Sequence, residues 1–191
     1  MNVRVTNGAE GLARRAFTVA EVWRMVESGV LAPDERFELI EGELVPMSPK
    51  GPVHELVKSA LAIALAKALP PDLWMGFETT LELSDATFVE PDLVVYPKRL
   101  ALRDVRGPDV LLAVEVADTS LDYDLGPKAR LFALHGIGEL WVVNARERTT
   151  TVHTLPGREG WGLIETKTAG DALVPSTPAL AHFRMRLAEI E

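Results

Sequence analysis

The stretch from Val110 to Lys128, VLLAVEVADTSLDYDLGPK, constrains this chain most, because it places a carboxylate inside a run of apolar residues. The run has the length of a buried strand, and Glu115 lies within it. A loop rich in Asp, Ser and Thr follows, and a helix is predicted to begin near Asp124, with Pro127 in its first turn. A buried carboxylate without a partner is costly or becomes neutral. We therefore expect a compensating group beside Glu115, and a metal ion is one candidate.

A second carboxylate has the same setting upstream. Asp92 lies within the apolar run FVEPDLVVY, residues 88–96, which is predicted as another central strand. Two hard oxygen ligands on neighbouring strands suit Mg²⁺ or Mn²⁺. A lysine beside such a metal can orient the attacking water and stabilise negative charge on a phosphate. The order strand, loop, helix start is expected to bring Lys128 back toward the end of the strand that carries Glu115.

Length and composition describe an ordinary globular chain. Its 191 residues are 47% hydrophobic and 25% charged, which predicts an ordinary folded domain. Residues 1–16 show little hydrophobic periodicity, so we expect a flexible arm there and the folded domain over residues 17–191. The chain has no cysteine, so disulfides and thiolate metal sites are excluded. Its net charge of −8 argues against a protein that coats nucleic acid non-specifically, but not against an enzyme that grips phosphate through a metal.

The sequence gives no sign of a membrane segment or a secretion signal. No apolar run reaches the ~18 residues of a membrane span. The first 17 residues, MNVRVTNGAEGLARRAF, lack the apolar core of a signal peptide. We therefore expect a cytoplasmic protein without a membrane partner.

The hydrophobic pattern predicts a mixed central sheet flanked by helices, an α/β (α+β) fold. A capping box, Thr18 to Glu21, starts the first helix, and a hairpin turns at Glu41-Gly42. The remaining expected elements are helices over residues 53–69 and 124–135 and strands over residues 75–83, 88–96, 110–116, 139–144, 149–155 and 161–166.

Five blocks of the chain resemble, in order and in wording, the Uma-type restriction endonuclease family of the PD-(D/E)XK nuclease superfamily. They are FELIEGELVPMSP, His54 on a helix, EPDLVVY, LLAVEVADTS and DLGPKARLFALHGIGELWVVN, and the match runs from about Phe17 to Leu187. The resemblance implies a restriction-endonuclease-like fold, a divalent metal ion and hydrolysis of phosphodiester bonds in DNA. It also implies that Asp92 and Glu115 bind the metal.

The chain departs from the superfamily pattern at one position. A lysine usually stands two residues after the second acid, and Ala117 stands there instead. The family resemblance implies that the lysine role has moved to Lys128. It also suggests Glu43, in the predicted hairpin, as a third catalytic acid.

Each of these residues also has a purely structural interpretation. Glu115 could form an ion pair with Lys128, Asp92 could bind backbone amides at a strand end, and Lys128 could be a solvated helix residue. Asp124 is predicted as a helix N-cap, which is a common position for Asp. His54, at a helix start, is an ordinary polar residue in the structural interpretation and a site residue in the functional one.

Three functions are compatible with the sequence. The first is a metal-dependent DNA endonuclease, for which a homodimer is expected because duplex cleavage needs two active sites. The second is a catalytically inactive DNA-binding or protein-interaction module on the same fold, which the acidic charge and Ala117 favour. The third is a metal phosphoesterase that acts on small nucleotides or RNA.

Overall fold

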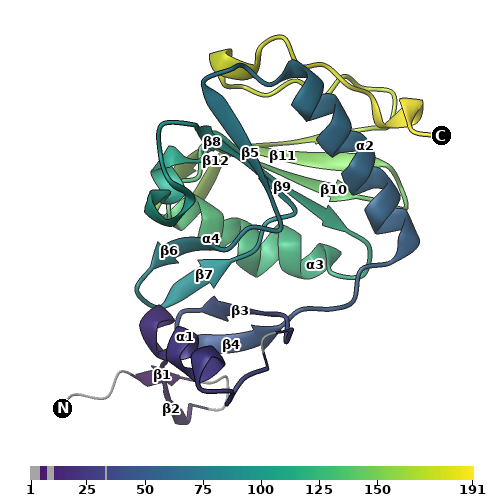
Figure 1. Ribbon diagram of the computed structural model, residues 1–191. Helices are drawn as coiled ribbons and strands as arrows, with labels where there is room; N and C mark the ends of the chain where they lie inside the picture. The colour runs from purple at the N-terminus through teal and green to yellow at the C-terminus, as the bar shows by residue number, and fades with distance from the viewer. Residues whose placement is uncertain (1–4, 8–10, 33) are drawn as a thin grey trace. The chain divides into compact units, whose positions relative to one another are not determined.

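The computed structural model describes residues 5–7, 11–32 and 34–191, which form two compact units (Figure 1). The first unit comprises Met1–Ser48 and Thr80–Glu90, and the second comprises Pro49–Thr79 and Pro91–Glu191. Each unit has a sheet of its own. No helix within the described ranges has both the length and the apolar composition needed to cross a membrane.

The first unit contains a short hairpin, one helix and a four-stranded antiparallel sheet in the order β4-β3-β7-β6. Its elements are β1 (Val5–Asn7), β2 (Ala13–Arg15), α1 (Val19–Glu27), β3 (Phe37–Ile40), β4 (Glu43–Pro46), β6 (Leu81–Ser84) and β7 (Thr87–Val89).

Local sequence signals explain two features of the first unit. The Thr18 side chain accepts a hydrogen bond from the Glu21 amide, and Glu21 accepts one from the Thr18 amide, so the predicted capping box is confirmed. The turn between β3 and β4 has Glu41 at φ 51° and Gly42 at φ 90°, a backbone that suits a two-residue hairpin. A Cβ on Gly42 would lie 2.6 Å from the Cβ of Ala16, so this turn requires glycine.

The expectation of a flexible arm over residues 1–16 concerns this unit. Residues 1–4 and 8–10 lie outside the described residues. Of the rest, β1 and β2 pair with each other in antiparallel register, from Val5–Arg15 to Asn7–Ala13. The flexibility of the arm and the boundary at residue 16 stay predictions.

The second unit is built on a six-stranded mixed sheet in the order β12-β11-β10-β9-β8-β5. All neighbouring strands are antiparallel except β9 and β10, which are parallel. Its elements are α2 (Pro52–Ala68), β5 (Leu73–Phe77), β8 (Leu93–Pro97), β9 (Leu112–Ala117), α3 (Leu121–Tyr123), the π-helical turn η3 (Asp124–Lys128), α4 (Ala129–Leu134), β10 (Glu139–Asn144), β11 (Thr149–Gly157) and β12 (Gly160–Lys167).

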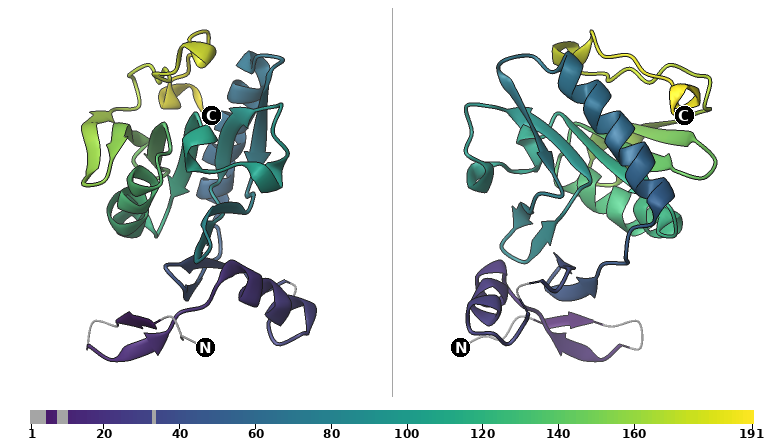
Figure 2. Two further views of the ribbon diagram at one scale, coloured as in Figure 1. Left: turned by 90° about the vertical axis from the view of Figure 1, so that its left-hand side faces the viewer. Right: turned by 45° about the vertical axis from the view of Figure 1, so that its right-hand side comes forward.

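Helices cover both faces of this sheet, with α2 on one side and α4 on the other (Figure 2). The main core lies between α2, the sheet and the C-terminal segment. It buries Leu61 of α2 against Val114 of β9, Trp141 of β10 and Phe183. The interior strands of this sheet are β8, β9, β10 and β11, and the first three have nearly continuous apolar sequences.

Two predicted strands are corrected by the structure, because each divides into two strands that join different sheets. Residues 75–83 divide into β5 and β6, with Glu78 at φ 43° between them. Residues 88–96 divide into β7 and β8 around Pro91, whose ring nitrogen cannot donate a strand hydrogen bond. Asp92 therefore lies directly before β8 and not inside a strand.

The predicted start of the helix at Asp124 is also wrong. The helical segment begins at Leu121, so Asp124 lies inside it and is not its N-cap. The side chain of Asp124 is buried and accepts a hydrogen bond of 2.5 Å from the Ser120 hydroxyl. Pro127 lacks the amide hydrogen of a regular helical turn, and the chain forms a π turn at this point.

Candidate active site

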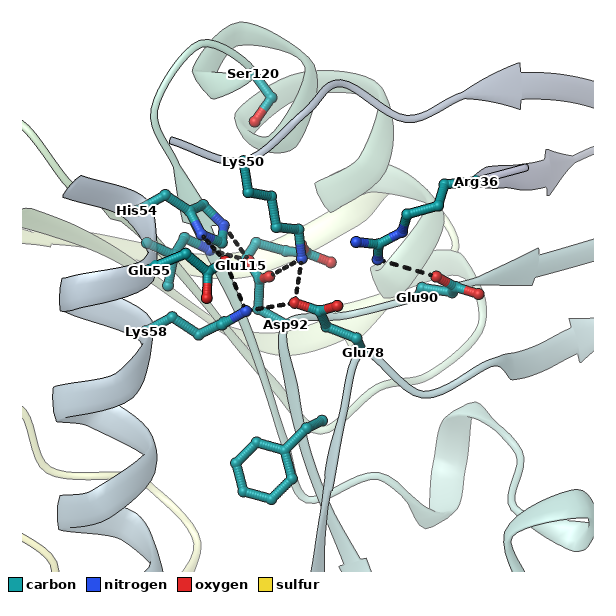
Figure 3. Close-up of polar contacts among 12 residues, drawn as sticks. Arg36, Lys50, His54, Glu55, Lys58, Glu78, Glu90, Asp92, Glu115 and Ser120 are labelled. Atoms are coloured by element: carbon teal, nitrogen blue, oxygen red, sulfur yellow. Dashed lines mark hydrogen bonds and ion pairs between the residues drawn. The ribbon is translucent and has the colours of Figure 1, made fainter. Parts of the chain in front are cut away.

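Two carboxylates stand at the same end of the β8–β9 pair. Leu93 is the first residue of β8 and pairs with Val114 of β9 in antiparallel register. Asp92 directly precedes Leu93, and Glu115 directly follows Val114, so the register carries both acids to one end of the pair. Both side chains are buried, at 3% and 5% exposure, among the residues drawn in Figure 3.

The carboxylate of Asp92 is held on both oxygens. Its Oδ2 accepts a hydrogen bond of 2.8 Å from the Val116 amide and lies 3.2 Å from Nε2 of His54. Its Oδ1 accepts a hydrogen bond of 2.5 Å from Nζ of Lys50. The backbone amide of β9 and the first turn of α2 therefore fix Asp92 in position, and Lys50 compensates its charge.

Glu115 and Lys128 form a buried ion pair in which Nζ lies 2.9 Å from Oε1. The π turn η3 ends at Lys128, and it returns the chain to the strand that carries Glu115. Nζ of Lys128 also lies 5.9 Å from the centre of the Phe132 ring. The geometry predicted for Lys128 is thus confirmed, and the structural partner considered for Glu115 is present.

A second group of charged residues adjoins Asp92 and was not found from the sequence (Figure 3). Lys50 bonds Glu78 at 2.9 Å as well as Asp92, and Lys58 bonds the same oxygen of Glu78. Lys58 also donates to Glu55 at 2.8 Å. Lys50 and Glu78 lie in loops, where hydrophobic periodicity carries no information, and no motif in the sequence marks them.

These contacts lower the pKa values of two carboxyl groups. Burial raises the pKa of Asp92, but the hydrogen bond from His54 and the charge of Lys50 outweigh burial, so the pKa falls from 3.8 to about 2. Burial likewise raises the pKa of Glu78, and its hydrogen bonds with Lys58 and Lys50 bring the value down from 4.5 to about 2. Both groups are therefore anionic at neutral pH.

His54 lies against Asp92 in this candidate site. Its ring is buried, with Nε2 facing Asp92 and Nδ1 at 3.2 Å from Oε1 of Glu55. The sequence placed it correctly near the start of a helix, because α2 begins at Pro52. Its position beside Asp92 depends on the fold and could not be predicted from helical periodicity.

Glu43, the third acid suggested by the family resemblance, belongs to the first unit. It is the first residue of β4, and its Oε1 accepts a hydrogen bond of 2.5 Å from the Thr6 hydroxyl. Its catalytic role stays a prediction.

The position of the usual superfamily lysine is occupied by a buried apolar side chain. Ala117 is 1% exposed at the end of β9, and its carbonyl accepts a hydrogen bond from the Ala145 amide. The next residue, Asp118, forms an ion pair with Arg146. The lysine that contacts Glu115 is Lys128, which lies at the end of the π turn η3.

The residue types at this site fit a divalent metal ion. Within residues 5–7, 11–32 and 34–191, no group of three or more His, Asp and Glu side chains is arranged to hold a metal. Mg²⁺, however, is often bound through one or two carboxylates, with water and substrate phosphate completing its shell. Asp92 and Glu115 supply two such carboxylates. Lys50 forms an ion pair with Asp92, and Lys128 forms one with Glu115. These two lysines compensate the negative charge that a bound metal ion would otherwise compensate.

Comparisons with known proteins agree with this architecture. A solved structure from Anabaena variabilis, described as a "putative nuclease belonging to DUF820", superposes with a TM-score of 0.73 at 15% sequence identity, covering 91% of this chain and 97% of that one. The fold is therefore restriction-endonuclease-like. The Uma2 family model, described as "Putative restriction endonuclease", matches residues 22–188. The chain belongs to the Uma2 family, as its sequence blocks predicted. A comparison with curated proteins finds no match.

Proposed function

We propose that this protein is a metal-dependent endonuclease that hydrolyses phosphodiester bonds in DNA. The observation that carries the proposal is the position of Asp92 and Glu115 at one end of the paired segment of β8 and β9, with Lys128 against Glu115. Membership of the Uma2 family and the restriction-endonuclease-like fold support a nuclease. DNA as the substrate and Mg²⁺ or Mn²⁺ as the cofactor come from the family resemblance and from the carboxylate ligand set.

Each residue has a distinct part in the proposed reaction. Asp92 and Glu115 would hold the divalent ion, which would supply Lewis-acid polarisation of the phosphate. Lys128, held against Glu115, orients the attacking water and stabilises the negative charge that develops on the phosphate. The Val116 amide and His54 fix Asp92, so the ligand does not need to reorient when the ion binds.

A non-catalytic module on the same fold is the second candidate. One observation favours it: lysines already neutralise both acids, Asp92 through Lys50 and Glu115 through Lys128. A protein that keeps these ion pairs permanently would bind neither metal nor a scissile phosphate.

Cleavage of plasmid and single-stranded DNA with Mg²⁺ or Mn²⁺ separates the two candidates. We expect the wild-type chain to cleave DNA and Glu115→Gln to cleave it more than about 100-fold more slowly. Glu165→Gln is the matched control, because Glu165 is an exposed residue of β12. This variant should cleave DNA at the wild-type rate. No cleavage by wild-type protein that binds DNA would favour the module, and full activity in Glu115→Gln would refute the assignment of Glu115.

The assembly and location of the enzyme remain predictions from the sequence. Duplex cleavage favours a homodimer, because each active site cuts one strand. We expect the protein to act on DNA in the cytoplasm.

A further inference from the structure

Lys50 occupies the part of Asp92 that a metal ion would need. Oδ2 of Asp92 is engaged by the Val116 amide and by His54. Oδ1 is engaged by Nζ of Lys50 at 2.5 Å. A divalent ion that approaches Oδ1 of Asp92 therefore meets the ammonium group of Lys50.

We propose that Lys50 is a built-in competitor of the divalent ion, displaced from Asp92 when the ion binds and then retained by Glu78. This inference rests on the proposed function, because it assumes that Asp92 is a metal ligand. It adds a regulatory feature to that site: the strength of metal binding is set by a lysine that is not itself a ligand.

The chemistry of the two cations supports competition. An ammonium group and a divalent ion both need the negative charge of Asp92, and at short range they repel each other. The side chain of Lys50 is 16% exposed, so its Nζ lies in a setting where water screens that repulsion weakly. Binding of the ion must therefore break the contact between Lys50 and Asp92.

Glu78 gives the displaced ammonium group a second acceptor. Its Oε1 already lies 2.9 Å from Nζ of Lys50, so Lys50 can give up Asp92 without losing its other ion pair. The pKa of Glu78 is about 2, which keeps it anionic at neutral pH. Without Glu78, displacement would leave a partly buried ammonium group without a carboxylate, which is unfavourable.

Lys58 provides a matched control for Lys50. Both lysines bond Glu78, but the second carboxylate is Asp92 for Lys50 and Glu55 for Lys58. Replacing either lysine by Met removes one positive charge from the same cluster. If charge alone sets the affinity, the two variants behave alike. If competition for Asp92 sets it, they differ.

The test is a calorimetric titration of the full chain with Mn²⁺. We expect Lys50→Met to lower the Kd by about tenfold, the size of one lost hydrogen bond between charged groups, and Lys58→Met to change it less than about threefold. Glu78→Gln should raise the Kd. In the Lys50→Met background the same Glu78→Gln change should have a smaller effect, because the lysine that Glu78 retains is gone.

Every outcome bears on the inference. Damage to the fold would weaken Mn²⁺ binding, so tighter binding by Lys50→Met cannot arise from damage. Equal Kd values for wild type and Lys50→Met, or equal gains in Lys50→Met and Lys58→Met, would overturn the competition while leaving the metal site in place. Absence of Mn²⁺ binding in all variants would instead overturn the proposed function, and the inference with it.

Discussion

At the scale of single residues, the site couples stability to function through the pair of Glu115 and Lys128. Both side chains are almost fully buried, and their charged atoms lie 2.9 Å apart. Removing one member of a buried pair leaves the other charge poorly compensated, which costs about 3–5 kcal/mol. Both Glu115→Ala and Glu115→Gln leave Lys128 without its counter-charge. Gln keeps the size of the side chain and an oxygen that can accept a hydrogen bond from Nζ, so Glu115→Gln disturbs the fold less and is the better test of function.

This coupling predicts different behaviour for stability and for activity. Lys128→Met should lower the free energy of unfolding by about 3–5 kcal/mol, because it leaves the buried Glu115 without its ion-pair partner. The double variant Glu115→Gln/Lys128→Met should recover most of that loss, because both charges are absent. Denaturant unfolding measures these values.

The cleavage activities of these variants should not follow the order of their stabilities. Lys128→Met and the double variant should both be inactive, since each lacks the proposed catalytic lysine. A double variant that is no more stable than Lys128→Met would contradict the account of the pair as a compensated buried charge. Activity in either variant would remove Lys128 from the catalytic residues.

At the scale of elements, the site is assembled from the ends of strands and helices. Asp92 precedes β8, Lys128 ends the π turn η3, and Lys50 precedes α2. Residues at such junctions are placed by the packing of the elements they join. The position of α4 is therefore expected to matter for Lys128, which directly precedes this helix.

Two glycines near these elements give a matched prediction. A Cβ on Gly107 would lie 2.0 Å from the backbone carbonyl oxygen of His135, at the end of α4, whereas a Cβ on Gly126 would meet no atom within 4 Å. Gly107→Ala should therefore destabilise the protein by about 1–3 kcal/mol or more. Gly126→Ala, inside the helical segment, should be neutral or stabilising by up to about 1 kcal/mol. Thermal unfolding compares the two, and equal melting temperatures would contradict the close approach.

The sequence predicted regular elements better than the junctions between them. Periodicity and capping located α1, α2 and the hairpin at Glu41-Gly42, because those signals are local. It missed the breaks at Glu78 and Pro91, since an apolar run looks the same whether it forms one strand or two in separate sheets. It also missed Lys50, because a loop residue acquires its partner from the tertiary fold.

At the scale of the whole molecule, the fold class was predictable because the family blocks extend over most of the chain. The matched region, residues 22–188, takes in most of both compact units, and the structural similarity persists at 15% identity. The acidic net charge of −8 makes unassisted binding to DNA unfavourable. A divalent ion at Asp92 and Glu115 would balance the charge of the two carboxylates at the place where phosphate must approach.

Titration of the wild type, Asp92→Asn and Glu115→Gln with Mn²⁺ would measure whether Asp92 and Glu115 bind one divalent ion together, as proposed. We predict one bound ion per wild-type chain and at least about tenfold weaker binding in each variant, with circular dichroism showing that both variants stay folded. Wild-type affinity in either folded variant would contradict the claim that the two acids form one metal site.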